Sequence, residues 1–288
     1  MSWLIFVILS VVLITVISLF EKYFLSHLVK DPRVLVAIGS FGFFLFSFLL
    51  IFFIDLSLTW AIVPAILGGI AHYFALYFYY DSLSKEDVSK VIPILSIMGV
   101  FVLILSYFLF SEVFTLIEYL GIFSLLLGTF IISMKGFSLP KFGKVFYFLI
   151  LAAFLFAVRT ILNNYAVMKI TPLEFLFWMG FGALIVAGFF AFKKASELKK
   201  VKKENLLGFG FVSFLAVLLM YTLSSALQLG TVTLTFMVYQ THIFFVFLLV
   251  TIISIFSPKS FKEDLNKWVI LQKAIAITLI FVGSILIL

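Results

Sequence analysis

The sequence predicts an all-α integral membrane protein with ten transmembrane helices, arranged as two inverted five-helix repeats around a central cavity. Its composition is the first observation behind this prediction, because 65% of the 288 residues are hydrophobic and only 11% are charged. Soluble domains contain about 45–50% apolar and about 25% charged residues, so a water-soluble fold would leave much of this apolar surface uncovered. The chain has no cysteine, which excludes a disulfide scaffold and thiolate metal sites.

Apolar runs of about 20 residues, the length that crosses the hydrocarbon core, are the second observation. Ten such runs cover roughly residues 3–20, 34–54, 61–81, 88–111, 116–134, 145–166, 173–192, 206–228, 231–256 and 268–288. Backbone groups in lipid must bond within the protein, so continuous runs predict helices, whereas β-barrel strands would alternate. The polar stretches 193–205 and 257–267 are too short for a soluble domain. The function is therefore expected inside the bundle, and the first run is expected to be a retained span.

A duplication is the third observation. An offset of 144 residues places Leu83 on Leu227 and Val88 on Val232, and the order of runs and polar hairpins repeats with it. The predicted repeats are residues 1–140 and 141–288. Because each repeat has an odd number of spans, the second enters the membrane from the opposite side. Inverted repeats are typical of secondary transporters, which bind substrate near the midplane between the halves.

Short motifs in the fourth and fifth runs resemble a known family. The residues that carry the resemblance are Val91-Ile-Pro-Ile-Leu-Ser96, Phe110-Ser-Glu-Val-Phe-Thr115, Glu118-Tyr-Leu-Gly121 and Gly128. A fourth helix with proline, a Glu-x-x-Thr turn and a fifth helix with two spaced glycines resemble the EamA branch of the drug/metabolite transporter (DMT) superfamily. The layout of the whole chain is similar to this family, and residues 71–134 also share its motifs. Gly99 departs from the pattern, because many members have a second proline there.

The resemblance and the duplication imply a secondary active transporter of small metabolites, such as amino acids or related amphiphilic compounds. It is expected to be a multi-pass protein of the plasma (inner) membrane that exports its substrate by alternating access. A carrier or importer of nucleotide sugars or phosphorylated metabolites is the alternative within transport. A membrane-embedded lipid-handling enzyme is the alternative from a different class.

An enzyme is not predicted, because the sequence has no clustered acids, no Ser-His-Asp arrangement and no His-rich helix. No cofactor and no metal site are expected either. The predicted partners are a small-molecule substrate and the lipid bilayer, and nucleic acid is not among them. Either His72 or His242 is a candidate carrier of a coupling proton, since an unperturbed histidine titrates near neutral pH. Both a monomer and a homodimer fit the sequence.

Polar side chains within the apolar runs predict the substrate site, since such groups in a membrane mark a pathway or pair with one another. Tyr221, Ser225 and Gln228 share one helical face, and Tyr239 and His242 follow at helical spacing in the next run. The predicted substrate-binding residues are Tyr77, Ser96, Arg159, Asn163, Tyr221, Ser225, Gln228, Tyr239 and His242. Hydrogen bonding between neighbouring helices is the alternative for the serines and the glutamine.

Arg159 is the sharpest single feature, because it lies in the middle of the sixth run. An arginine at that depth requires a carboxylate, an anionic group of the substrate, or a path by which its side chain can snorkel to the interface. Glu21, Asp81 and Glu112 are the candidate carboxylates. Pro93, early in the fourth run, is the predicted gating residue, because proline frees a backbone carbonyl and can kink a helix; simple packing is the alternative.

The distribution of positive charge predicts the orientation of the chain. On one side of the predicted bundle lie 18 of the 20 Lys and Arg residues. The positive-inside rule therefore predicts that both termini lie outside the cytoplasm. Members of the resembled family are usually drawn with both termini inside, so the two lines of reasoning give opposite orientations.

Overall fold

The computed structural model describes residues 2–29, 31–86, 88–134, 143–193, 203–246, 248–249 and 267–287. Helices account for the regular structure of this part of the chain. Six of them are long and apolar enough to cross a membrane. These six are α1 (Ser2–His27), α2 (Pro32–Phe48) with the 3₁₀ helix η1 (Leu49–Phe53), α3 (Ile62–Leu83), α7 (Lys144–Val167), α8 (Pro172–Lys193) and α10 (Lys203–Leu229).

Shorter helices make up the rest of the bundle. They are α4 (Val88–Leu95), α5 (Met98–Phe110), α6 (Leu116–Ser133), α11 (Val232–Gln240) and α13 (Lys267–Leu286). The prediction of an all-helical membrane protein is confirmed. The count of ten full spans stays a prediction, because the fourth apolar run forms two helices, α4 and α5, and the ninth run is interrupted after α11.

Two helix interruptions occupy corresponding places in the two halves of the chain. At the end of α4, the amide of Ile97 donates to the carbonyl of Ile94 (3.2 Å), and beyond α11 the amide of Thr241 donates to Val238 (3.1 Å). Both bonds have the tighter spacing of a 3₁₀ turn. Residues 97 and 241 are separated by 144 residues, the offset at which the sequence predicts a repeat. Pro93 lies in α4 shortly before the first interruption, but its side chain lies outside the described part of the structure.

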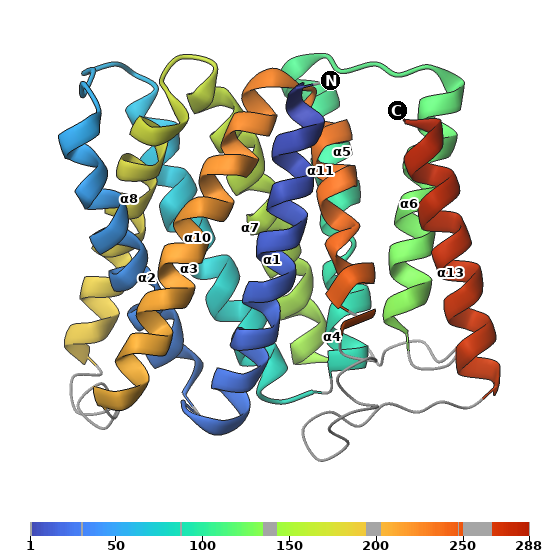
Figure 1. The fold of residues 1–288 in the computed structure, drawn as a ribbon, viewed down its shortest axis with the longest axis horizontal. Helices are drawn as coiled ribbons and strands as arrows, with labels where there is room; N and C mark the ends of the chain where they lie inside the picture. The colour runs from blue at the N-terminus through green and yellow to red at the C-terminus, as the bar shows by residue number, and fades with distance from the viewer. Residues whose placement is uncertain are drawn as a thin grey trace.

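Helix packing also repeats between the halves. The third long helix of the first half, α3, packs against α7 and α8, which begin the second half; α10 correspondingly packs against α1 and α2. In addition, α2 packs against α8 and α6 packs against α13. In Figure 1, the α2–α8 pair and the α6–α13 pair lie at opposite ends of the bundle, with α1, α7, α10 and α11 between them.

Glycines allow the closest of these helix contacts. A Cβ atom on Gly69 of α3 would lie 2.0 Å from the carbonyl oxygen of Met179, and one on Gly182 of α8 would lie 2.1 Å from that of Ile66. At the other end of the bundle, a Cβ on Gly283 of α13 would lie 2.7 Å from the carbonyl oxygen of Gly121. Lipid gives helices no hydrophobic reason to associate, so close backbone approach through small residues supplies the packing energy.

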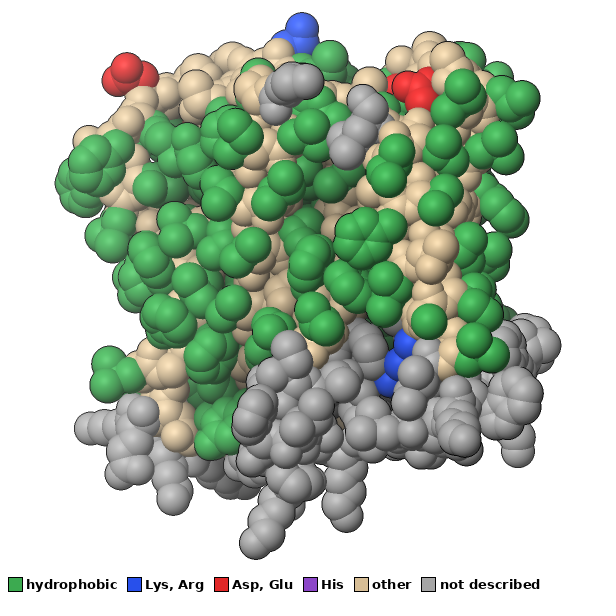
Figure 2. All heavy atoms as spheres, turned by 45° about the vertical axis from the view of Figure 1, so that its right-hand side comes forward, with side chains coloured by type: hydrophobic (Ala, Val, Ile, Leu, Met, Phe, Trp, Pro, Cys, Tyr) green, Lys and Arg blue, Asp and Glu red, His purple; other side chains and the backbone are tan. Residues whose placement is uncertain are grey.

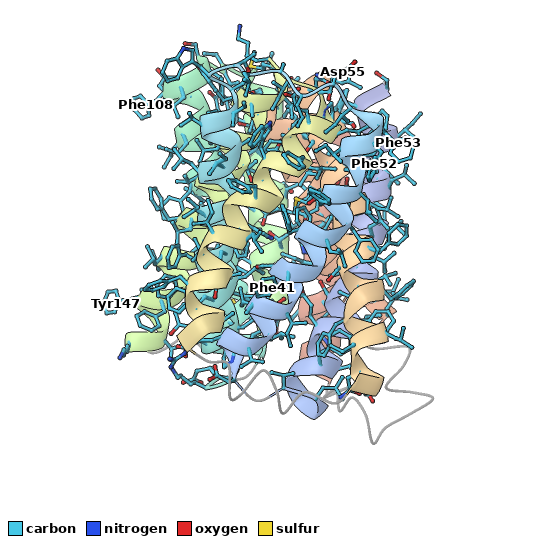
Figure 3. The ribbon with its side chains drawn as sticks, turned by 90° about the vertical axis from the view of Figure 1, so that its left-hand side faces the viewer. Phe41, Phe52, Phe53, Asp55, Phe108 and Tyr147 are labelled. Atoms are coloured by element: carbon cyan, nitrogen blue, oxygen red, sulfur yellow. The ribbon has the colours of Figure 1, made fainter. Side chains whose placement is uncertain are left out.

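The outer surface is that of a protein in lipid. Hydrophobic side chains cover the face in Figure 2 between its upper and lower edges. Phe52, Phe53 and Phe108 are among the most exposed aromatic residues, and they project outward from the bundle (Figure 3). The two termini lie at the same edge (Figure 1), and the connections from α1 to α2 and from α3 to α4 lie at the opposite edge.

The glycine contact between α3 and α8 makes a stability prediction. We expect Gly182→Ala to lower the free energy of unfolding by about 1–3 kcal/mol, because its Cβ collides with backbone that cannot rotate away. The matched control on the same helix is Gly188→Ala, where a Cβ would meet nothing within 4 Å. Thermal unfolding in detergent measures both variants. Equal melting temperatures for the two would show that this contact does not hold α3 against α8.

Candidate functional site

Arg159 of α7 is buried in the middle of the bundle, with 4% of its surface exposed. Its Nη1 lies 3.2 Å from the sulfur of Met220 on α10, and its Nη2 donates to the hydroxyl of Thr160 at 3.3 Å. The guanidinium also lies 5.9 Å from the centre of the Phe156 ring. Among the described residues, Nε has no hydrogen-bond partner. In this part of the chain the cation therefore contacts neutral groups and no counter-charge.

The carboxylates that the sequence analysis offered to Arg159 bond elsewhere. Glu21 accepts a hydrogen bond from the hydroxyl of Tyr80 at 2.5 Å, and Asp81 pairs with Lys85 one helical turn later. Glu112 accepts the backbone amides of residues 232 and 233, at 2.6 and 3.1 Å. None of the three bonds to Arg159. Glu112 instead places its negative charge at the positive N-terminal end of α11, which is a stabilising arrangement.

Two further titratable side chains lie near the guanidinium. His72 of α3 and Tyr239 of α11 are both close enough to Arg159 to interact with it electrostatically. The His72 ring stands edge-on to Phe156, with 5.9 Å between ring centres, and its buried Nδ1 has no hydrogen-bond partner within the described ranges. Helices from both halves of the chain, α3 on one side and α7, α10 and α11 on the other, therefore supply this cluster.

Polar contacts between α7 and α10 continue from the Arg159 cluster toward the edge that holds the termini. The amide nitrogen of Asn163 donates to the hydroxyl of Ser224 at 3.0 Å, while its buried Oδ1 has no partner in the part of the chain that the structure describes. Gln228 donates to the carbonyl oxygen of Val167 at 2.8 Å, which satisfies one of the free carbonyls at the end of α7.

A cavity of about 520 Å³ lies at this edge of the bundle. Gln228, Asn164 and Glu112 are the polar amide and carboxylate side chains of its wall, and Trp3 and Phe110 are among the apolar ones. This volume falls in the range of about 300–1,000 Å³ found for small-molecule sites. The cavity and the buried cluster share α7 and α10, since Asn163 and Asn164 are neighbours in sequence.

The structure brings some of the predicted site residues together and separates others. Arg159, Asn163 and Tyr239 belong to the central cluster, and Gln228 lines the cavity. Tyr221 is half-buried against the main core, and the hydroxyl of Ser225 bonds to the carbonyl of Tyr221 on its own helix.

Two predicted residues lie elsewhere, and a third, His242, adjoins Tyr239 at the border of the cluster. Tyr77 belongs to a separate apolar cluster around Tyr73 and Phe24. Ser96 lies at the interruption between α4 and α5. His242 lies just beyond the interruption after α11, where its Nδ1 bonds to the carbonyl oxygen of Tyr239 at 2.8 Å. A carbonyl only accepts, so this nitrogen carries the proton.

Sequence reasoning missed several partners in the site. Met220 contacts Arg159, but a methionine in an apolar run does not differ from its neighbours in polarity, so the sequence could not identify it. Gln240, beside Tyr239 and left out of the predicted site, is 1% exposed, and neither of its amide atoms has a hydrogen-bond partner among the described residues. It packs against Gly99, where a Cβ would lie only 2.2 Å from its Nε2. The departure at Gly99 from the family pattern was the available signal, because only glycine leaves this space.

The capping role of Glu112 makes a second stability prediction. We expect Glu112→Gln to lower the free energy of unfolding by about 1–2 kcal/mol, because a neutral amide accepts the two α11 amides more weakly than a carboxylate. Asp55→Asn, in the exposed loop after η1 (Figure 3), removes one negative charge at an exposed position and serves as the control. Thermal unfolding in detergent compares the two variants. An unchanged Glu112→Gln protein would contradict the capping role.

Comparison with known proteins identifies the family. Residues 1–134 match the EamA-like transporter family, which belongs to the DMT superfamily. The resemblance inferred from the motifs is therefore confirmed over residues 1–134. A solved structure described only as "Crystal structure of protein" is similar in fold, with a TM-score of 0.75 and 14% identity over 99% of this chain and 96% of that chain. No curated protein gives a significant match.

Proposed function

We propose that this chain, whose residues 1–134 match the EamA-like transporter family, is a secondary active transporter that exports small amphiphilic carboxylates, amino acids and their derivatives among them, across the plasma (inner) membrane. The observation that carries the proposal is Arg159, a buried cation with a free Nε and no carboxylate among its partners in the described residues. An uncompensated charge at this depth is costly. An anionic group of the substrate would supply the missing partner.

The groups around Arg159 suit a carboxylate attached to an apolar body. Guanidinium nitrogens bind a carboxylate through two parallel hydrogen bonds. The unpartnered His72 Nδ1 and Asn163 Oδ1 offer further polar contacts, and the rings of Phe156 and Tyr239 offer an apolar wall. The cavity beside Gln228 opens at the edge that holds the termini, and it would be the entrance for the substrate on that side.

Alternating access would follow from two inverted five-helix repeats, residues 1–140 and 141–288. Three features support this arrangement: the exchange of packing partners between the halves, the matching helix interruptions, and a polar cluster built from both halves. Discontinuous helices near the midplane are typical of such transporters. Pro93 would act as a gate residue, because it lies in α4 just before the interruption between α4 and α5. The helix that follows this interruption, α5, packs on α11 of the other half.

Phosphorylated metabolites are the second candidate class, because arginine also binds phosphate. One buried cation balances one negative charge, which favours a monocarboxylate over a phosphate dianion or a nucleotide-linked pyrophosphate. Counterflow in proteoliposomes tests the choice with L-phenylalanine, N-acetyl-L-phenylalanine and glucose 1-phosphate, against protein-free vesicles. We expect the two carboxylates to exchange. Exchange of glucose 1-phosphate alone would select the second class, and exchange of none would refute the proposal.

Replacement of Arg159 tests its role directly. We expect Arg159→Ala to weaken transport of N-acetyl-L-phenylalanine by about 10- to 150-fold, because a hydrogen bond to a charged partner contributes about 1.5–3 kcal/mol. Initial rates of counterflow over a range of substrate concentrations give the change in affinity. The exposed Arg33 at the start of α2 offers the matched control, Arg33→Ala, which should transport normally. Normal transport by Arg159→Ala would refute the anion site.

Neutral contacts should contribute less. We expect Gln228→Leu and Tyr239→Phe each to weaken affinity by about two- to tenfold, since a neutral hydrogen bond contributes about 0.5–1.5 kcal/mol. The same counterflow assay measures them. Thr278→Val on α13 is the control, because this hydroxyl bonds only to a carbonyl one turn earlier on its own helix in the described contacts. Full activity of both site variants would remove Gln228 and Tyr239 from the binding site.

A further inference from the structure

We infer that the cavity at the edge that holds the termini binds the ammonium group of an amphiphilic amine, with Glu112 as its counter-charge. For the substrates proposed above, this group is the α-amino group of a free amino acid, and that assignment rests on the proposed function. The entrance would then favour free amino acids over N-acylated ones, while Arg159 binds the carboxylate in the interior of the bundle.

The charge of the cavity wall is negative. Glu112 contributes a carboxylate whose position is fixed by its bonds to the first backbone amides of α11. An ionised carboxylate can accept about four hydrogen bonds, so acceptor sites remain for a ligand. No lysine, arginine or histidine is among the described residues that line the cavity. Lys169 follows the lining residue Met168, but it is exposed and lies outside the wall.

The other polar groups of the wall are hydrogen-bond acceptors. Gln228 uses its Nε2 to donate to the carbonyl of Val167 at 2.8 Å, so its amide oxygen remains for a ligand. Asn164 likewise directs its Nδ2 at the sulfur of Met168, at 3.7 Å. Residues 227–229 form the last turn of α10, where carbonyl oxygens lack partners within the helix. An alkylammonium has three N–H donors and no acceptor, so it complements this wall.

Aromatic rings complete the cavity. Trp3 of α1 and Phe110 of α5 both line it, and indole is the ring that attracts a cation most strongly. Gly230 allows the indole to approach, because a Cβ there would lie 3.1 Å from the Trp3 ring and 2.8 Å from the hydroxyl oxygen of Thr235. This hydroxyl is buried and has no hydrogen-bond partner within the described ranges. A further acceptor therefore lies beside the cavity.

The cavity and the buried cation are separate sites along α7. Arg159 lies five residues before the lining residue Asn164, which is roughly 8 Å along a helix axis. The ammonium and the carboxylate of an α-amino acid are attached to one carbon atom, so we expect such a molecule to occupy the two sites one after the other. An N-acylated acid would meet the Glu112 charge without an ammonium to balance it.

Isothermal titration of the purified full chain tests the cavity with L-phenylalaninamide and N-acetyl-L-phenylalaninamide, corrected for binding to protein-free micelles. Both ligands lack a carboxylate. Only the first carries an ammonium at about pH 6, which is below the pKa of an α-amino group. We expect L-phenylalaninamide to bind at least about tenfold more tightly, because hydrogen bonds between charged groups are stronger than those of a neutral amide.

Two variants locate the ammonium in the cavity. Glu112→Gln should weaken binding of L-phenylalaninamide at least about tenfold, because the ammonium loses its counter-charge. Trp3→Leu keeps the carboxylate and should weaken binding by about two- to fivefold, through loss of the cation–π contact. Glu118→Gln is the matched control and should bind as wild type, because Glu118 caps another helix, α6, and is not among the lining residues.

Equal binding of the two ligands by the wild-type protein would overturn the inference. Wild-type affinity for L-phenylalaninamide in Glu112→Gln would also overturn it. If Glu112→Gln does not fold, the Trp3→Leu protein decides, and wild-type affinity in that variant would overturn the ammonium site. Selective binding of L-phenylalaninamide without counterflow of any carboxylate would refute the proposed function and leave the ammonium site intact.

Discussion

Close backbone contacts between helices hold this bundle together, because lipid offers no hydrophobic drive for helix association. The contacts through Gly69 and Gly182 join α3 to α8, and those through Gly121 and Gly283 join α6 to α13. The helices α7, α10 and α11 lie between the α2–α8 pair and the α6–α13 pair (Figure 1), and α3, which packs on α7, adds His72 to the polar cluster. Close packing of these helices therefore surrounds a polar interior in the middle of the bundle.

Backbone groups without a regular helical hydrogen bond are also found in the interior of the bundle. Where α4 gives way to α5 and where α11 ends, carbonyls and amides leave the regular ladder, and each site of interruption faces other helices instead of lipid. Polar side chains satisfy the freed groups: Glu112 accepts the first amides of α11, and His242 donates to a carbonyl at its end. These caps fix the ends of α11 and so hold Tyr239 near Arg159.

Composition and run length were sufficient to predict a helical membrane protein, since lipid permits few other folds. Arg159 could also be identified from the sequence, because a charged side chain within a membrane-spanning run is costly and requires a partner. The direction in which an individual side chain points was not predictable. Tyr77 and Ser225 are polar like the residues of the Arg159 cluster, but Tyr77 packs in an apolar cluster and Ser225 bonds to a carbonyl of its own helix. Apolar residues suit lipid and core equally, so the runs carry no strong amphipathic signal. The Glu21–Tyr80 contact joins residues 59 apart, which no local pattern reveals.

The central claim is that the buried guanidinium of Arg159 selects a carboxylate. Isothermal titration of the purified protein with N-acetyl-L-phenylalanine and with its carboxamide, N-acetyl-L-phenylalaninamide, tests this claim most directly, because the two ligands differ only in that group. Because arginine binds a charged carboxylate more strongly than a neutral amide, we expect the carboxylate to bind at least about tenfold more tightly than the carboxamide. Equal affinities for the two ligands would contradict the account.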